Sequence, residues 1–237
     1  RRDTSHADAA HRPTNRQYDR YLWLLEHFRG LGWDKTMLHD ASPFKVVDPG
    51  FNAILIRSES DLAGLADELG EGEIVEENRD QARKGLDALE TLFSASHGQY
   101  LCFDRVTGAP VDSASSGGLL PALAAIPRDR AARLAGTIRT RAAAGSRIVP
   151  SHDPNDPRFE AKRYWRGPVW LIVNHLIADG LSIAGETETA AAIRDSSLRL
   201  VAESGFAEYY DPVTGAPLGG ADFTWTAAMV LELVAPR

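Results

Sequence analysis

Apolar residues recur every three to four positions along most of this 237-residue chain, which is the period of an α-helix. Between residues 15 and 31, for example, Tyr18, Leu22 and Leu25 share one face, and Gly32 then marks an end. Strictly alternating runs, the pattern of strands, are scarce. The pattern predicts an all-α protein. About nine helices are expected: 15–31, one opening at 49, a short one closing at 70, 73–93, 118–126, 128–141, 168–184, 187–204 and 223–234.

Capping residues and breakers define several of these ends. Asp48-Pro49 supplies an N-cap and a proline at the first helical position. Ser60 or Asp61 is the expected cap of the next, shorter helix, and Gly70 its end. These signals predict two consecutive helices between residues 49 and 70.

Gly167-Pro168 predicts the start of an apolar helix that ends at Ala184. Residues 164–166 then lie on the loop before its positive end. The preceding loop, residues 143–163, is rich in Ser, Asp and Pro. Loops of this length inside a compact domain usually serve a function.

One internal repeat is present. DRVTGAPV at 104–111 reappears as DPVTGAPL at 211–218, each copy after an aromatic-rich segment. Gly108 and Gly215 are available for a positive φ in a chain reversal. The repeat indicates either a common turn or, as we favour, equivalent helical hairpins that recur as in a toroid of helix pairs.

Composition excludes several classes of function. The net charge is −7 and the basic residues are scattered, so a nucleic-acid partner is not expected. A single cysteine, Cys102, rules out an internal disulfide framework and a Cys-based zinc site. The longest apolar run, residues 169–178, is interrupted by Asn174 and His175 and is too short for a membrane span.

A metal or other cofactor is not expected. His6 and His11 are five residues apart in an irregular segment, and the remaining histidines lack carboxylates at ligand spacing. Residues 115–118, Ser-Ser-Gly-Gly, are too short for a phosphate loop and lack a following lysine.

The chemistry-bearing residues gather in three segments: YWRGPVW (164–170), FAEYYDPVTG (206–215) and FTWTAA (223–228). Aromatic rings stack on the C–H faces of sugars, and a positioned carboxylate can take a proton from water. Glu208 is therefore the candidate catalytic residue, against the alternative of a solvated glutamate. Core packing is the alternative for the aromatic residues. The candidate substrate-binding residues are Tyr164, Trp165, Arg166, Trp170, Tyr209 and Trp225.

Nearly the whole chain resembles glycoside hydrolase family 63, and within it the bacterial mannosylglycerate and glucosylglycerate hydrolases. The likeness lies in RRDTSHADAAHRPTNRQYDRYLWL at the start, SPFKVVDPGFNAIL at 42–55, and the three later segments in family order. Trehalases of family 37 show a more distant version of the same endings. The resemblance implies an (α/α)6 toroid, six helical hairpins around a central pocket, and an inverting mechanism. By motif, Glu208 matches the general base, and Tyr164, Trp165 and Trp170 match aromatic residues around the sugar.

The general acid of this family is an aspartate in a GMDNSPRW-like motif, upstream of the segment that matches residues 1–3. That motif is absent from this sequence. Residues 1–237 are therefore expected to form the C-terminal part of a single (α/α)6 catalytic domain, incomplete on its N-terminal side. About nine of twelve family helices and one of two carboxylates would be present, and the isolated chain is expected to be inactive.

The resemblance implies a cytoplasmic bacterial α-glycoside hydrolase that inverts the anomeric centre of glucosylglycerate or mannosylglycerate. A trehalase-like or amylo-α-1,6-glucosidase-like enzyme is one alternative, and a non-catalytic sugar-binding toroid is another. The expected partner is a small carbohydrate, with no nucleic acid and no membrane; a homo-oligomer stays open.

Overall fold

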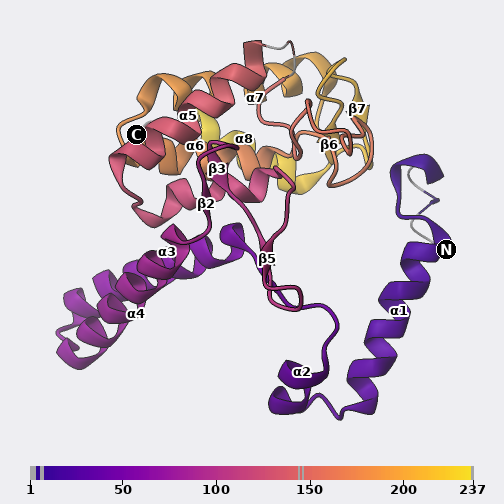
Figure 1. Ribbon diagram of the computed structural model, residues 1–237. Coiled ribbons are helices and arrows are strands. Elements are labelled where there is room, and N and C mark those ends of the chain that lie inside the picture. The colour runs from indigo at the N-terminus through magenta and orange to yellow at the C-terminus, as the bar shows by residue number, and fades with distance from the viewer. Residues whose placement is uncertain (1–3, 6–7, 144, 146, 236–237) are drawn as a thin grey trace.

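The computed structural model describes residues 4–5, 8–143, 145 and 147–235, and this part of the chain is predominantly helical (Figure 1). Eight α-helices lie within it: α1 (Asn15–Gly30), α2 (Lys35–Ala41), α3 (Pro49–Leu69), α4 (Gly72–Glu90), α5 (Arg128–Ala143), α6 (Leu171–Ile183), α7 (Thr187–Ser204) and α8 (Thr224–Val234). Three 3-10 turns accompany them: η1 (Ala9–His11), η2 (Ser116–Gly118) and η3 (Leu120–Ala124). The predicted all-α class is confirmed.

The strands are two-residue ladders in the loops between helices. They are β1 (Val46–Val47), β2 (Phe93–Ser94), β3 (Gln99–Tyr100), β4 (Phe103–Asp104), β5 (Ala109–Pro110), β6 (Tyr209–Tyr210) and β7 (Pro217–Leu218). All pairings are antiparallel, in the orders β1-β4-β5, β2-β3 and β6-β7. These ladders fix loop geometry, and the helices supply the bulk of the core.

Helix pairs form the framework. α3 packs against α4, and α6 against α7, each pair joined by a tight turn at a glycine with positive φ, Gly70 or Gly185 (Figure 1). The largest core cluster joins α3, α5, α6 and η3 through fully buried residues such as Leu134 and Ile177. A smaller cluster joins α7, β6 and α8 around Leu200. α6 therefore lies between neighbours, as its largely apolar sequence requires.

Residues 49–69 form one continuous helix, so the prediction of two helices is wrong here. No glycine or proline interrupts the segment between Gly50 and Gly64. Ser60 bonds back to the Ile56 carbonyl at 3.0 Å, and Asp61 pairs with Arg57 at 2.8 Å, one helical turn away. Both side chains thus satisfy themselves inside a helix and do not cap a new one.

Three further expectations differ from the structure. Residues 118–126 form short 3-10 turns, with Ala125 at a φ of 51°. α6 begins at Leu171, three residues later than predicted, because Val169 exchanges backbone hydrogen bonds with Tyr210 at 2.8 and 3.0 Å and is held extended. α2 was not predicted; the side chain of Asp34 caps it by accepting from the Met37 N–H at 2.9 Å.

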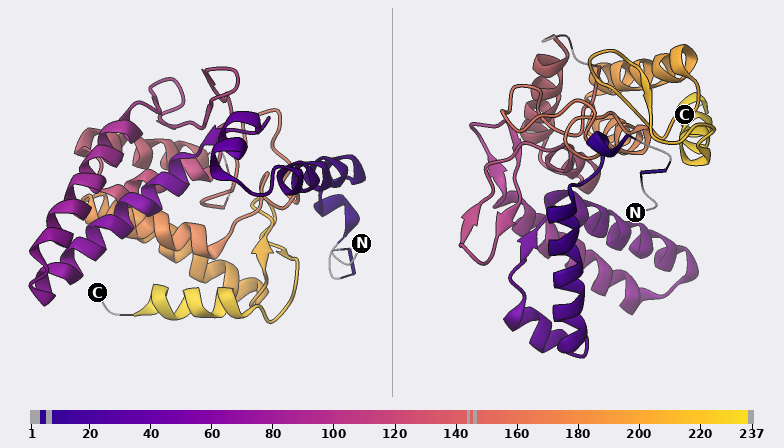
Figure 2. Two further views of the ribbon diagram at one scale, coloured as in Figure 1. Left: turned by 90° about the horizontal axis from the view of Figure 1, so that it is seen from below. Right: turned by 90° about the vertical axis from the view of Figure 1, so that its right-hand side faces the viewer.

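Two apolar helix faces in the first third of the chain are open, one on α1 and one on α3. α1 and α2 stand apart from the helical body, and only the N-terminal end of α1 points towards the β6–β7 hairpin (Figure 1 and Figure 2). The exposed apolar side chains on α1 and α3 include Tyr21, Leu22, Trp23, Leu25, Phe51, Ile54, Leu55, Leu62, Leu65 and Leu69. Amphipathic faces of this size normally pack against another element. None of the described helices is long and apolar enough to cross a membrane.

Candidate active site

The backbone brings the two principal motifs together. Glu208 directly precedes β6, and its N–H donates to the carbonyl of Gly220 across the hairpin at 2.9 Å. Tyr210, the second residue of β6, forms a β-bridge with Val169 in the other motif. Residues 164–170 and 206–215 thus form one structural unit, as the sequence predicts.

Three donors surround the carboxylate of Glu208. The hydroxyl of Tyr164 donates to Oε1 at 2.9 Å, and the N–H of Gly220 donates to Oε2 at 3.2 Å. The guanidinium of Arg12 lies 3.6 Å from Oε2, and the Arg12 and Glu208 side chains are each 13% exposed. The carboxylate is thus oriented by fixed groups but keeps access to solvent, which is the arrangement that a base acting on water needs.

Aromatic rings form the wall beside this carboxylate. Trp170 stacks on Trp165 with centroids 4.2 Å apart and on Tyr209 at 4.8 Å. Tyr164 meets Trp170 edge-on at 5.0 Å, and its carbonyl accepts from the Trp170 indole N–H at 3.0 Å. Trp170 is only 2% exposed, whereas Trp165 is 48% exposed. Trp165 therefore offers an open ring face, and Trp170 fixes the rings around it.

The two phenols next to the carboxylate stay protonated over the physiological range. Burial raises the pKa of Tyr209 to about 12, with Arg12 opposing the shift and Glu208 adding to it. Burial likewise raises the pKa of Tyr164. The buried hydroxyl of Tyr209 has no hydrogen-bond partner among the described residues. It remains a donor that a bound hydroxyl or water could use.

Arg12 is a site residue that the pattern of the sequence did not reveal. Its guanidinium lies 4.4 Å from the centre of the Tyr164 ring, in cation–π contact, and its Nε is buried without a hydrogen-bond partner among the described residues. It belongs to the segment HRPT just before α1, inside the stretch that carries the family resemblance. Its place in that stretch was the only feature of the sequence that could have identified it as a site residue.

Of the last two candidate residues, Arg166 lies beside this cluster, and Trp225 makes its described ring contact outside it. Arg166 is exposed and pairs with Glu160 at 2.8 Å. It also lines, with its neighbours from 163 to 165, a cavity of about 180 Å³ whose other wall is Pro13, Gln17 and Tyr21. Trp225 is exposed at the start of α8, where its ring lies against Phe223 at 6.4 Å. Their substrate-binding roles stay predictions.

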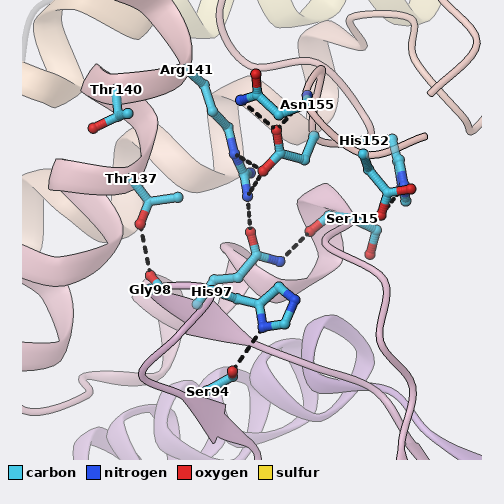
Figure 3. Close-up of polar contacts among 12 residues, drawn as sticks. Ser94, His97, Gly98, Ser115, Thr137, Thr140, Arg141, His152 and Asn155 are labelled. Atoms are coloured by element: carbon cyan, nitrogen blue, oxygen red, sulfur yellow. Dashed lines mark hydrogen bonds and ion pairs between the residues drawn. The ribbon is translucent and has the colours of Figure 1, made fainter. Parts of the chain in front are cut away.

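A second network anchors the loop that leads to Tyr164 (Figure 3). The buried guanidinium of Arg141 donates from Nε to Asp153 at 3.1 Å and from Nη2 to the Gln99 amide oxygen at 2.5 Å. Gln99 in turn donates to the carbonyl of Ser115 at 2.9 Å. α5, β3 and the loop are thereby joined.

The same loop is also tied to the YWRGPVW segment and to α6. The N–H of Gly167 donates to the Ser151 hydroxyl at 3.0 Å, and Asn174 in α6 accepts from the Val149 N–H at 3.0 Å. The loop was predicted to be functional, and its residues 147–163 serve as the support of the aromatic wall.

His152 is buried in this loop, and its environment leads us to expect a stability that depends on pH. Its ring lies 3.3 Å from Asp156, and burial lowers its pKa below the usual value. A lowered folded-state pKa means that the unfolded chain binds the proton more tightly. The stabilisation is thus complete above about pH 6.5 and is lost as the pH falls towards the folded-state pKa.

We expect the Tm to fall between pH 7.5 and pH 5.5, and to fall less in His152→Gln. Asp156 does not contribute in this window, because its pKa is lowered, first by Arg158, and its effect belongs to more acid pH. Circular dichroism melts of both proteins measure the difference. Parallel Tm–pH curves would contradict the assignment.

Metal ligation has no support in the described residues, where no group of three His, Cys, Asp or Glu side chains converges. His6, one of the histidines considered from the sequence, lies outside the described residues.

Comparison with known proteins places this site in a family. Residues 2–226 match the family described as Mannosylglycerate hydrolase MGH1-like glycoside hydrolase domain. Mannosylglycerate hydrolase MGH1 of Selaginella moellendorffii is 42% identical over 232 residues, which are 98% of this chain and 48% of that protein. Glucosylglycerate hydrolase of Mycolicibacterium hassiacum is 32% identical over an aligned length of 244 residues. The match covers 95% of this chain and 52% of that protein. The chain thus spans about half the length of the curated relatives it matches.

The fold agrees with a solved structure of the same kind. The crystal structure of the GH63 mannosylglycerate hydrolase from Thermus thermophilus in complex with Tris superposes with a TM-score of 0.93 at 42% identity. The match covers 98% of this chain and 56% of that chain. The predicted fold class, an α/α toroid of the six-hairpin glycosidases, is confirmed. The chain belongs to the MGH1-like glycoside hydrolase domain of family 63.

Proposed function

We propose that the protein carrying this chain hydrolyses a small α-glycoside of glycerate, mannosylglycerate or glucosylglycerate, with inversion at the sugar. The observation that carries the proposal is the carboxylate of Glu208, held by Tyr164, Gly220 and Arg12 beside an aromatic wall. The named activities of relatives at 42% and 32% identity support it.

Glu208 acts as the general base. It takes a proton from a water molecule, whose oxygen attacks the anomeric carbon on the face opposite the glycerate. The bond between that carbon and the glycosidic oxygen breaks, and a carboxylic acid from outside residues 1–237 protonates the departing oxygen. Inverting enzymes hold their two carboxyl groups about 6.5–9.5 Å apart, which leaves room for the water.

Arg12 favours a glycerate glycoside over an uncharged substrate. Its guanidinium lies beside Glu208 and over the ring of Tyr164, where it would attract the carboxylate of the substrate. The open face of Trp165 would stack on the sugar, and the buried hydroxyl of Tyr209 would donate to a water molecule enclosed beside it. The uncharged substrate of a trehalase-like enzyme would give this guanidinium no anion to bind beyond Glu208, so we rank that activity second. The cytoplasmic location stays a prediction, as does the oligomeric state.

Proton NMR of the fresh product tests the proposal. The full-length protein that contains this chain should first release the β-anomer from an α-linked glycosylglycerate, and the α-anomer should appear only by later equilibration. Residues 1–237 alone should show no hydrolysis, because the general acid is missing. An initial α-anomer would indicate a retaining mechanism and would remove the base role from Glu208.

A further inference from the structure

The two repeat copies fold into the same hairpin. In each, the aspartate carboxylate accepts from the N–H two residues later at 2.8 Å, in Asp104 and in Asp211 alike. Gly108 and Gly215 then take a φ of 70° and 78°. The register is also shared, since Phe103 pairs with Pro110 and Tyr210 with Pro217. Each copy follows a long helix, α4 or α7.

The copies differ on the two sides of the shared turn. Where the second copy has Glu208, the first has Leu101. Where the second continues with Gly219-Gly220, the first continues with Asp112-Ser113. The hairpin itself therefore does not require the two glycines, and they occur in the copy that carries the carboxylate.

Gly219 lies directly against that carboxylate. A Cβ added at this position would collide with Oε2 of Glu208 and lie 2.7 Å from both the Glu208 Cβ and a ring carbon of Tyr209. The backbone of Gly219 also has a φ of 75°, which L side chains rarely adopt. The next residue, Gly220, is the one whose N–H donates to Oε2.

We propose that Gly219 is a positioning residue for Glu208. Its missing side chain lets the turn close onto the carboxylate, so that Oε2 stays on the Gly220 N–H while Oε1 stays on Tyr164. A methyl group at 219 displaces the carboxylate from the water that it must deprotonate, and displacements near 1 Å can cost about 10²-fold in rate. This inference rests on the proposed base role of Glu208.

The positioning role of Gly219 is tested with Gly219→Ala in the full-length protein, and Gly108→Ala is the matched control. Both changes place a Cβ on a left-handed residue, with φ of 75° and 70°, but the Cβ at 108 meets nothing within 4 Å. The backbone strain is therefore matched, and the two variants differ in the contacts of the new Cβ with Glu208 and with the neighbouring ring of Tyr209. Gly219→Ala should lower kcat by about 10²-fold with a small change in KM, and should shift the acid limb of the kcat–pH profile. Gly108→Ala should lower the Tm but keep the wild-type kcat and pH profile.

Gly219→Asn separates strain from contact. Asparagine tolerates the left-handed region better than alanine but still carries the Cβ, so kcat should fall even if Gly219→Ala fails to fold. Wild-type kcat in a folded Gly219→Ala or Gly219→Asn protein overturns the positioning role. If Glu208→Gln is inactive in the same assay, wild-type kcat in the Gly219 variants refutes only the positioning role, and the proposed function stands. Normal turnover by Glu208→Gln would instead overturn the proposed function itself.

Discussion

Replacing Glu208 by Gln is expected to lower kcat by about 10²–10⁴-fold in the full-length protein, the range that a general base supplies. The amide is nearly the same size as the carboxylate and still accepts a hydrogen bond from Tyr164, but it cannot take the proton from water. The base acts mainly in the transition state, so KM should change little. Initial rates of glycosylglycerate hydrolysis measure both constants.

Glu203→Gln is the matched control for this experiment. Glu203 lies five residues earlier, in the last turn of α7, and pairs with Arg147 at 3.0 Å on the surface. Removing its charge should leave kcat at the wild-type value. Comparable turnover in Glu208→Gln and Glu203→Gln would refute the base assignment.

Replacing Trp170 by Ala is expected to destabilise the protein by about 3–5 kcal/mol, the cost of truncating a large buried aromatic side chain. The change removes two stacked ring contacts and the indole N–H bond to the Tyr164 carbonyl. Tyr164 then loses the group that holds its backbone, so Glu208 loses part of its orientation as well. Both stability and kcat should fall.

Trp165→Ala separates packing from binding. Trp165 is 48% exposed, so its loss should cost little stability but weaken sugar binding through the lost stacking face. Urea unfolding gives the stability of each variant. Calorimetric titration with the glycoside gives the binding affinity, measured with Glu208→Gln also present so that the substrate is not hydrolysed. Equal unfolding free energies for the Trp170 and Trp165 variants would contradict the division of roles.

Local patterns in the sequence were sufficient for most helices. α7 has the predicted bounds, because an uninterrupted apolar period runs from Thr187 to Ser204 and Gly205 follows as the C-cap. The sequence did not predict that residues 49–69 form one helix. Serine and aspartate often cap helices, but Ser60 and Asp61 here bond to groups one turn earlier in the same helix. The late start of α6 was missed because the Val169–Tyr210 bridge joins segments distant in the sequence.

The candidate site divides in the same way. Glu208 and its aromatic neighbours were recognisable because their residue types suit sugar chemistry. The contrast between buried Trp170 and exposed Trp165 depends on which rings lie across from them, which composition does not specify. Arg12 has no local pattern at all, and tertiary folding alone brings it to the carboxylate.

The attachment of α1 has a consequence for energetics. Two side-chain links tie its N-terminal region to the site: Arg12 with Glu208 and Tyr164, and Gln17 with Arg163 at 2.9 Å. A species that binds the guanidinium of Arg12 more tightly in one position of α1 than in another therefore also shifts the docking of this helix, and the reverse holds by thermodynamic linkage. A partner that covers the open apolar face of α1 only in its docked position would favour the charge pair at Glu208 without touching it. In this protein, the free energy of helix docking and the free energy of ligand capture are coupled through one arginine.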